Sequence, residues 1–478
     1  MTQTKPLVLD VDGTFLRTDL LFESFWSGLG HAPFDVLRAC RAHFRDRSRL
    51  KSELARIGKP RLDLVPVDPN VLTTAQTALE QGHEVLLASA ADKPLVQELA
   101  QMHGLSDRVF ASGGGINLKG RAKAKALVDA FGNQGFHYAG NERIDIEIWK
   151  QADEAIIVGP VRDAKASMEA LNRPYTQLPG GWRKRDLIRA LRPHQYVKNV
   201  LLLLPIIAAH QFSFEALLPI LFGIIAFSAA ASSIYIVNDL LDLAADRLHP
   251  KKKTRPFASG AVPIFVGMKA CAALMLAALG IAATLNWAFF FIVLLYMGLS
   301  LAYSLKLKRM RWIDIATLAG LYTIRVVAGA AAGMVDVTTY MLVFIFPVFV
   351  TLGCVKRLTE LTLATSDERL PGRGYGRPDR GDLLNVAGLG MFGAMLVFFL
   401  YSFTDQAKEL YPTQWLLWVA MLPLAAWLFR MVSLGYKGKQ DYDPIVFAMR
   451  DRHGISLIIF TLTLMFYAAG LFHRAFGY

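Results

Sequence analysis

Two carboxylates one residue apart form the first group in the chain with the pattern of a reactive site. Leu7-Val8-Leu9 is an apolar run that predicts a buried strand, and Asp10 and Asp12 follow at its end. Gly13 then lets the chain turn. Both carboxylates would project from the carboxyl end of the strand into a loop. There one could attack the phosphorus of a phosphate ester while the other carries a proton.

A second acidic group lies near the middle of the chain, at Asp239, Asp242 and Asp246. Their spacing of three and four residues places them on one face of a helix, where they would repel one another without a cation. Together they could bind Mg²⁺ that chelates a diphosphate. Lys252 and Arg255 follow in a basic cluster that could neutralise the diphosphate charge. A solvated helix end explains neither the spacing nor these cations.

The composition places these groups in a membrane protein. The 478 residues are 54% hydrophobic and only 19% charged, which is too apolar for a soluble enzyme of this length and excludes disordered, collagenous and disulfide-scaffold proteins. The net charge of +13 indicates basic loops that face anionic lipids and anionic substrates, in preference to nucleic acid. The three cysteines are far apart, so neither disulfides nor zinc form the framework.

The pattern changes along the chain and predicts two domains. Residues 1–175 alternate short apolar strands with charged helices, which predicts an α/β domain of Rossmann-like type. Residues 176–192 are rich in turn-forming and basic residues and are predicted to be a linker. Residues 193–478 are predicted to form an all-α transmembrane bundle. The helical, charged stretch from Leu20 to Ile57 would cap the α/β site.

The second domain contains nine apolar stretches of roughly spanning length. The basic residues gather in alternate connections, which by the positive-inside rule are cytoplasmic, and the opposite side has little beyond Lys408 and Arg474. With no signal peptide in evidence, the N-terminal domain is expected in the cytoplasm, the C-terminus outside, and the protein in the inner membrane. The stretches are 197–211, 216–237, 264–283, 286–304, 313–333, 338–355, 383–403, 414–432 and 455–473.

Residues 5–160 resemble the haloacid dehalogenase superfamily of phosphatases. The matching segments, in the order of that family, are Leu7 to Thr14, Val85 to Ser89, Gly120 to Lys123 and Tyr138 to Asp145. The resemblance implies that Asp10 is the nucleophile and Asp12 the general acid and base. It further implies that Ser89 and Lys123 hold phosphate, with Lys119 or Lys125 as alternatives to Lys123. Mg²⁺ would be held by Asp10, Asp12, Asn141 and Asp145, although Asn141 stands where the family usually has an aspartate.

The segment from Asn238 to Pro256 resembles the first signature of the UbiA superfamily of intramembrane prenyltransferases, which are nine-helix bundles. That signature runs Asn-Asp-x-x-Asp-x-x-x-Asp and then His-Pro-x-Lys-x-x-Arg-Pro. A second polar patch, with Tyr303, Lys306, Asp314 and Arg325, lies half a domain later. Leu318 stands where a second Asp-x-x-x-Asp would end, so the second acidic site is incomplete. Arg325 falls within a span and should face a polar cavity and a carboxylate, either Asp314 or an acid of the first motif.

Several short blocks resemble one branch of this superfamily, the polyprenyl-phosphate phosphoribosyltransferases, such as those acting on decaprenyl phosphate. These enzymes transfer 5-phosphoribose from phosphoribosyl diphosphate to a lipid phosphate. The resemblance implies that Asn238, Lys252 and Arg255 bind the donor, and that Lys198, Lys306, Lys356 and Arg357 position the anionic lipid. The blocks are Arg192 to Asn199, Tyr303 to Lys308, Lys356 to Glu360, Asp443-Pro444 and Arg450 to Arg452.

Three functions remain open on the sequence. The first is a Mg²⁺-dependent phosphoribosyltransferase whose N-terminal phosphatase removes the 5-phosphate, giving polyprenyl-phosphoryl-ribose. The second is a prenyl-diphosphate:aromatic prenyltransferase with a phosphatase that acts on an unrelated metabolite. The third is a non-catalytic membrane scaffold that binds phosphorylated metabolites. The incomplete second acidic patch favours the first function over the second, and the Asp10 and Asp12 pair disfavours the third. Lipid length and oligomeric state, including a homo-oligomer, stay open.

Overall fold

The computed structural model describes residues 4–113, 117–336, 338–364, 367–370, 373–440 and 443–476. The chain divides into two compact units. The first consists of Met1–Leu191 together with Tyr235–Cys271, and the second of Arg192–Ile234 together with Ala272–Tyr478. The divisions fall inside two helices, α11 (Phe214–Leu241) and α13 (Ile264–Leu285). The middle of the chain therefore contributes to the same unit as the N-terminal domain.

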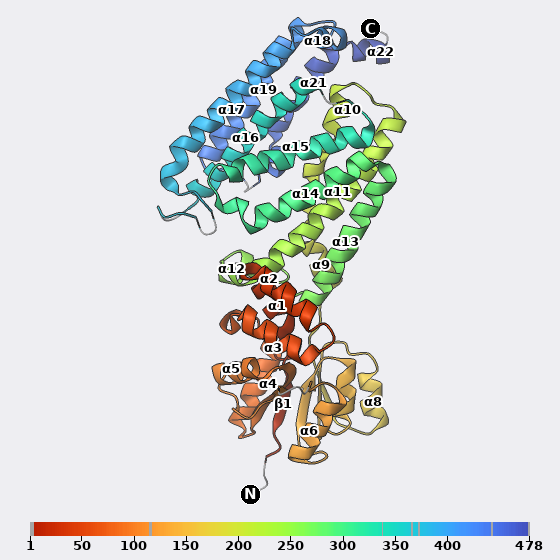
Figure 1. Cartoon of the computed structure of the whole chain (residues 1–478), viewed down its shortest axis with the longest axis vertical. Helices are drawn as coiled ribbons and strands as arrows, with labels where there is room; N and C mark the ends of the chain where they lie inside the picture. Colours follow the sequence, from red (N-terminus) through yellow and green to blue (C-terminus); the bar gives the residue numbers. More distant parts are fainter. Residues whose placement is uncertain are drawn as a thin grey trace. The chain divides into compact units, whose positions relative to one another are not determined.

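The first unit contains a six-stranded parallel sheet with the strand order β3-β2-β1-β4-β5-β6. Strand β1 is labelled in Figure 1. The order reverses at β1, which pairs with β2 on one side and with β4 on the other. In open parallel sheets, ligands bind outside the carboxyl ends of the strands at such a switch point. The strands are β1 (Leu7–Asp10), β2 (Val85–Asp92), β3 (Phe110–Ser112), β4 (His137–Gly140), β5 (Ala155–Val158) and β6 (Tyr175–Leu178).

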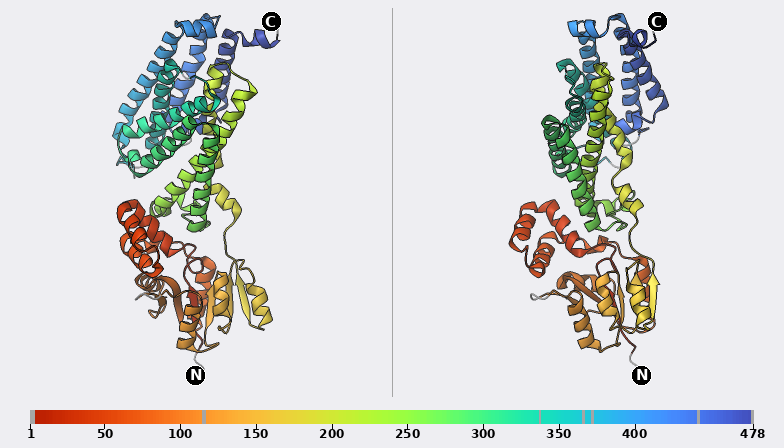
Figure 2. Two further views of the ribbon diagram at one scale, coloured as in Figure 1. Left: turned by 45° about the vertical axis from the view of Figure 1, so that its right-hand side comes forward. Right: turned by 90° about the vertical axis from the view of Figure 1, so that its right-hand side faces the viewer.

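Helices cover both faces of this sheet, which explains why its strands are apolar on both sides (Figure 2). On one face, Leu9 and Leu87 pack against α4 (Pro69–Glu80) and α5 (Lys93–Met102). On the other face, Val8 and Leu86 pack against α6 (Arg121–Phe131), α7 (Ile146–Trp149) and α8 (Ala164–Ala170). The three-layer α/β arrangement agrees with the predicted fold class for this part of the chain.

Three helices follow β1 within the stretch that was predicted to be helical. They are α1 (Leu20–His31), α2 (Pro33–Ala42) and α3 (Arg47–Gly58). Asp19 caps α1 by accepting hydrogen bonds from the amides of Leu21 and Phe22. The three helices share a small apolar cluster of their own, centred on Val36, Ala39 and Leu54.

The predicted boundary at residue 175 cuts through the sheet. Strand β6 pairs with β5 over four residues, from Ala155 with Tyr175 to Val158 with Leu178. The stretch 176–192 that was predicted as a linker also contains helix α9 (Lys184–Ala190). Turn-forming and basic residues therefore surround regular elements here, and the α/β fold continues past the predicted end.

The acidic segment does not lie on one continuous helix, and the prediction of a single helical stripe was wrong. Helix α11 ends at Leu241, and α12 (Leu243–Leu248) begins after Asp242, whose backbone is non-helical with φ −99° and ψ 14°. Asp239 therefore lies on the last turn of α11 and Asp246 on α12. A short helix η4 (Lys252–Thr254) follows before α13.

Seven described helices are long and apolar enough to cross a membrane: α11, α13, α14 (Trp287–Leu305), α15 (Ile313–Gly333), α16 (Thr339–Thr362), α17 (Arg380–Tyr401) with its preceding turn, and α19 (Trp415–Tyr436). The last predicted span is the shorter apolar helix α21 (Arg452–Ala468). The first is a 3-10 helix η3 (Pro193–Leu203) followed by α10 (Leu204–Ala208). A multi-pass membrane protein is thus supported, while the count of nine spans stays a prediction.

Shorter elements are η1 (Leu62–Leu64), η2 (Arg143–Asp145), η5 (Leu307–Arg309), η6 (Arg377–Asp379), α18 (Asp405–Leu410), α20 (Pro444–Ala448) and α22 (Leu471–Phe476).

Helix α15 is the most enclosed of the seven spans in the second unit. Its Gly329 lies directly against the backbone of η3, where an added Cβ would come within 2.0 Å of the Leu202 carbonyl oxygen. Small residues permit this close approach of backbones, which is typical of helix packing in membranes. The packing fixes α15, which carries Asp314 and Arg325, beside η3, which carries Lys198 and Asn199.

Candidate functional site

The carboxyl edge of the α/β sheet brings together the residues that were predicted from four separate segments. The Lys123 ammonium group lies 2.5 Å from Asp10 Oδ1, and both side chains are buried. Ser89 Oγ donates a hydrogen bond to Asp12 Oδ2 at 3.1 Å, and the amide of Leu20 donates to Asp12 Oδ1 at 2.8 Å. A buried cation therefore faces the predicted nucleophile, and the second carboxylate is oriented by two donors.

The other predicted residues of this edge follow β4. Asn141 Oδ1 accepts a hydrogen bond from Thr14 Oγ1 at 3.1 Å. The Asn141 amide nitrogen lies 2.3 Å from where a Cβ on Gly13 would be, so only glycine fits in the turn after Asp12. Asp145 Oδ2 accepts hydrogen bonds from the amides of Asn141 and Glu142 at 3.1 and 2.9 Å. The Asp145 carboxylate thus binds the backbone of the loop that directly precedes it.

Three residues of this site were not predicted. The hydroxyl of Tyr138 accepts a hydrogen bond from Lys123 at 3.1 Å and donates to Asp145 Oδ1 at 3.3 Å, which links the two charged groups. Thr14 is the second, and its place in the Asp-x-Asp-Gly-Thr motif was the available signal. The third is Lys51 of α3, whose ammonium group donates to the Ala90 carbonyl oxygen at 2.5 Å. Nothing in the sequence around Lys51 indicates that contact.

Burial raises the pKa of three of these carboxyl groups, Asp10, Asp12 and Asp145, although Lys123 opposes the shift at Asp10. Burial, and then the nearby charges of Asp19 and Asp10, raise the pKa of Asp12 to about 8. Burial and the charge of Asp10 raise the pKa of Asp145 to about 7. Burial opposes the charge on Lys123, yet the nearby Asp10 and Asp145 raise the pKa of Lys123. A protonated Asp12 beside an ion-paired Asp10 is the arrangement that a general acid next to a nucleophile requires.

The donor set at this edge is made of hard oxygen ligands, which suits Mg²⁺ in kind. Within the described part of the chain, however, no group of three His, Cys, Asp or Glu side chains is arranged to hold a metal ion. Asp10 is engaged by Lys123, and Asp145 by two backbone amides. The predicted metal ligands Asp10, Asp12, Asn141 and Asp145 are therefore neighbours, and their binding of Mg²⁺ stays a prediction.

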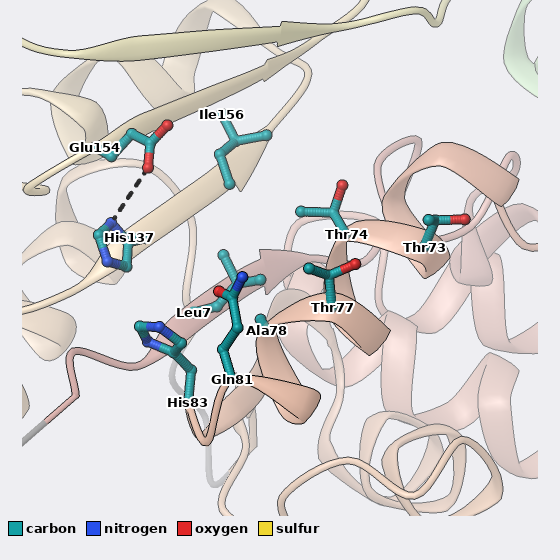
Figure 3. Close-up of a pocket in the computed structure, with 10 residues that line it drawn as sticks. All are labelled: Leu7, Thr73, Thr74, Thr77, Ala78, Gln81, His83, His137, Glu154 and Ile156. Atoms are coloured by element: carbon teal, nitrogen blue, oxygen red, sulfur yellow. Dashed lines mark ion pairs between the residues drawn. The ribbon is translucent and has the colours of Figure 1, made fainter.

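A cavity with a volume of about 310 Å³ lies at the opposite edge of the sheet (Figure 3). Its lining includes the first residues of β1 and β4, Leu7 and His137. His137 Nδ1 lies 3.7 Å from Glu154 Oε2, and burial lowers the pKa of His137, so a neutral ring weakens this pairing. The cavity contains none of the predicted site residues.

The acidic segment of the first unit is organised around Arg255. One nitrogen of its guanidinium group, Nη1, lies 3.1 Å from Asp239 Oδ1 and 2.7 Å from Asp246 Oδ2. The structure thus brings both carboxylates together across the helix break. Burial raises the pKa of Asp246, although Arg255 opposes this shift. Of the other predicted residues, Asn238 Oδ1 is buried without a hydrogen-bond partner in the described part of the chain, and Lys252 starts η4.

In the second unit, the predicted cations form two ion-pair clusters. In the Arg357 cluster, Arg357 pairs with Asp314 through Nε at 2.5 Å and Nη2 at 2.8 Å, and with Glu360 at 2.5 Å. Tyr303 donates to Asp314 Oδ1 at 2.9 Å. Arg357 and Asp314 are fully buried. Arg373 completes the cluster at 3.8 Å from Glu360.

In the Asp443 cluster, Lys198 and Lys356 share one carboxylate oxygen, Asp443 Oδ2, and Lys356 lies 3.8 Å from it. Tyr322 donates to the same oxygen at 3.4 Å. Glu360 and Asp443 stood in segments with a family resemblance but were not predicted as site residues. Lys306, in contrast, ends α14 and is exposed.

Arg325 is buried. Of the two carboxylate partners predicted for it, Asp314 pairs with Arg357 instead, and pairing with an acid of the first motif stays a prediction. Arg325 Nε donates to Asn199 Oδ1 at 3.2 Å, Nη1 to the Leu321 carbonyl at 2.6 Å and Nη2 to Tyr296 Oη at 2.9 Å. Its guanidinium carbon lies 4.8 Å from the centre of the Tyr296 ring. Neutral oxygens and an aromatic face are thus among the groups that contact this charge within the span.

Residues 200–450, more than half of the chain, match the UbiA prenyltransferase family. The chain belongs to the UbiA prenyltransferase family. This UbiA family member is 32% identical to the uncharacterized protein y4nM of Sinorhizobium fredii over 459 residues, which are 94% of this chain and 88% of y4nM. That alignment includes both the α/β part and the helical part.

Shorter relatives match part of the chain. The nodulation protein NoeC of Azorhizobium caulinodans is 34% identical over 275 residues, 56% of this chain and 88% of NoeC. The decaprenyl-phosphate phosphoribosyltransferase of Mycobacterium tuberculosis is 29% identical over 293 residues, 60% of this chain and 93% of that enzyme. A UbiA homolog from Archaeoglobus fulgidus, solved bound to GPP and Mg²⁺, has a TM-score of 0.45 at 17% identity and covers 60% of this chain and 99% of that one.

Proposed function

We propose that this UbiA family member transfers 5-phosphoribose from phosphoribosyl diphosphate to a polyprenyl phosphate, and that its α/β domain then removes the 5-phosphate. The similarity to decaprenyl-phosphate phosphoribosyltransferase, at 29% identity over 93% of that enzyme, is the observation that carries the transferase half. The buried contact between Lys123 and Asp10, with Asp12 oriented beside them, supports the phosphatase half.

In the transfer step, an oxygen of the lipid phosphate forms a bond to C1 of the ribose while the bond from C1 to the diphosphate breaks. The diphosphate leaves with the bonding electrons, so positive charge near it lowers the barrier. Arg255 is our candidate for this role, because a guanidinium group shared by two carboxylates can turn to an arriving anion. Asp239, Asp242 and Asp246 would hold Mg²⁺ together with the Asn238 oxygen, which has no hydrogen-bond partner among the described residues, and the ion would further neutralise the leaving diphosphate.

The acceptor needs no strong base, because a lipid phosphate is already an anion. It needs cations that hold it near the membrane surface, and Lys198, Lys356 and Lys306 are the candidates. Lys198 and Lys356 share Asp443, so a bound phosphate would compete with that carboxylate for them. Arg357 is held by Asp314 and Glu360, and we assign it to ordering the helix ends instead of to direct phosphate binding.

In the phosphatase step, an Asp10 oxygen attacks the phosphorus of the 5-phosphate, and the bond between phosphorus and the ribose 5-oxygen breaks. Asp12, protonated at neutral pH, gives its proton to that oxygen. Asp12 then accepts a proton from water, which attacks the aspartyl phosphate and releases inorganic phosphate with Asp10 restored. Lys123 compensates the phosphate charge, and Mg²⁺ at Asp10, Asp12, Asn141 and Asp145 would add to that compensation.

Membranes that contain the protein test both halves. Labelled phosphoribosyl diphosphate with polyprenyl phosphate should give a labelled lipid that lacks the 5-phosphate, whereas a prenyl diphosphate with a phenolic acid should give none. Asp239→Asn should lower transfer by at least about a hundredfold, and Asp10→Asn should leave transfer intact while the phosphorylated ribosyl lipid accumulates. A labelled phenolic product in place of the ribosyl lipid would overturn the transferase half. Full removal of the 5-phosphate by Asp10→Asn would overturn the phosphatase half.

A further inference from the structure

A buried ion pair joins helix α1 to the acidic segment, and both belong to the first unit. The two guanidinium nitrogens of Arg247 lie 3.0 and 2.6 Å from the two carboxylate oxygens of Glu23, a bidentate geometry. Glu23 is 3% exposed, and its Oε1 also accepts a hydrogen bond from Thr18 at 2.8 Å. Neither residue belongs to the nucleophile motif or to the three acids.

Close packing surrounds this pair. Phe22 stacks on Phe265 with ring centres 5.5 Å apart and planes at 15°. Gly260 has φ +69°, and an added Cβ would lie 2.6 Å from Arg17 Cβ and 2.7 Å from the Arg17 carbonyl oxygen. The segment after Arg255 therefore packs closely against the α/β domain at Gly260 in the loop and at Phe265 in α13. Burial of two charges costs desolvation free energy. Packing of the acidic segment against α1 would therefore not by itself require an ion pair here.

Arg247 connects this contact to the donor site. It follows Asp246 directly in α12, and its Nε donates to the Ala258 carbonyl oxygen at 3.1 Å. Ala258 lies three residues after Arg255, which bridges Asp239 and Asp246. Arg247 thus ties the helix that carries one acid to the loop that carries the bridging arginine. Glu23 fixes the orientation of Arg247 from the other side.

We propose that Glu23 is a positioning residue for diphosphate binding at the acidic segment, acting through Arg247. The proposal rests on the proposed function only in taking Asp239, Asp242 and Asp246 as a diphosphate site. It follows that the α/β domain supports the first reaction as well as performing the second. Helix α1 serves both sites in its first turn, since the Leu20 amide binds Asp12 and Glu23 binds Arg247.

The test measures binding of inorganic diphosphate, with Mg²⁺, to the full-length protein in detergent by calorimetry. Glu23→Gln should weaken binding about tenfold, the usual cost of losing a group that orients a metal-site residue. The matched control is Glu53→Gln, which removes an exposed carboxylate that pairs with Arg56 on α3. Glu23→Asp keeps the carboxylate and should retain more affinity than Glu23→Gln at the same melting temperature, and Asp239→Asn should abolish binding.

The outcomes separate the inference from the proposed function. Wild-type binding within twofold in Glu23→Gln, or equal affinities of Glu23→Asp and Glu23→Gln at equal melting temperatures, would overturn the positioning role. If Glu23→Gln does not fold, Arg247→Lys keeps the charge but loses the bidentate geometry, and unchanged affinity there would overturn it equally. Absence of phosphoribosyl transfer with normal diphosphate binding would reject the proposed function alone.

Discussion

At the scale of single residues, pairing decides which predicted groups can react. Burial raises the pKa of Asp10, but the adjacent Lys123 opposes this shift, whereas burial near Asp19 and Asp10 raises the pKa of Asp12 to about 8. Two carboxyl groups of the same motif therefore have different electrostatic surroundings. Differences of this kind are how one site provides both a nucleophile and an acid.

Substitution of Arg325 tests whether its buried charge is needed for the transfer reaction or for the stability of the fold. Arg325→Leu removes its hydrogen bonds to Asn199, Leu321 and Tyr296, and we expect phosphoribosyl transfer to fall at least about tenfold. Arg325→Lys keeps the charge and should retain more activity at the same melting temperature. Transfer rates and thermal unfolding in detergent measure the two effects. A stable and fully active Arg325→Leu protein would argue against both roles.

His137 should make the stability of the folded protein decrease as the pH falls. Burial lowers its pKa below the ordinary 6.5, with Glu154 and Asp153 opposing. As the pH falls through 6.5, the unfolded chain therefore binds a proton that the folded chain does not, and stability is lost towards the folded pKa. His137→Gln cannot bind this proton, so its melting temperature should change less between pH 7.5 and 5.5. If the melting temperatures of both proteins change equally between pH 7.5 and 5.5, His137 is not the source of this pH dependence.

At the scale of elements, sequence patterns predicted what depends on local apolar runs. The strands before Asp10, Ser89 and Asn141 were predictable, and so was their meeting, because the carboxyl ends of neighbouring parallel strands share one edge. The helix break at Asp242 was not predictable, because its side chain makes no capping hydrogen bond there. Arg255 and Arg247 hold the segment instead, through contacts that only the folded chain creates.

The same limit applies to the pair formed by Asp314 and Arg357. These residues are 43 positions apart on α15 and α16, and their contact depends on how the two helices pack. The sequence instead suggested Arg325 as a partner of Asp314, because a charge within a span requires a carboxylate, with an acid of the first motif as the alternative. Helical periodicity identifies which residues are neighbours within one helix. It carries no information about which residue of another helix they contact.

The contact of α15 with η3 gives a prediction for this element. Gly329→Val places side-chain atoms where the Leu202 carbonyl already lies, so η3 must move. We expect destabilisation by about 2–4 kcal/mol and weaker acceptor binding, because η3 carries Lys198. Gly320→Val on the same helix has open space and serves as the control. Equal melting temperatures for the two variants would show that the close contact does not exist.

At the scale of the whole molecule, the basic connections predict the orientation in the membrane. In a protein whose three cysteines are replaced by alanine, a membrane-impermeant maleimide added to intact cells should label Lys408→Cys but not Lys437→Cys. Both positions are exposed, so accessibility within the protein is matched. Permeabilised cells should label both. The reverse pattern would place the α/β domain and the acidic segment outside the cytoplasm.

The discontinuity of the first unit constrains how the protein is synthesised. Residues up to Leu191 leave the ribosome well before Tyr235–Cys271, and Glu23 precedes Arg247 by 224 residues. Until Arg247 is translated, the nascent α/β domain therefore has an unmatched carboxylate and an uncovered Phe22. During that interval Thr18 is the one hydrogen-bond partner of Glu23 named above that has already been translated. After insertion of α11 into the membrane, its C-terminal end and the following α12 have to reach this surface, so the order of translation makes the earlier domain the binding partner of the later segment.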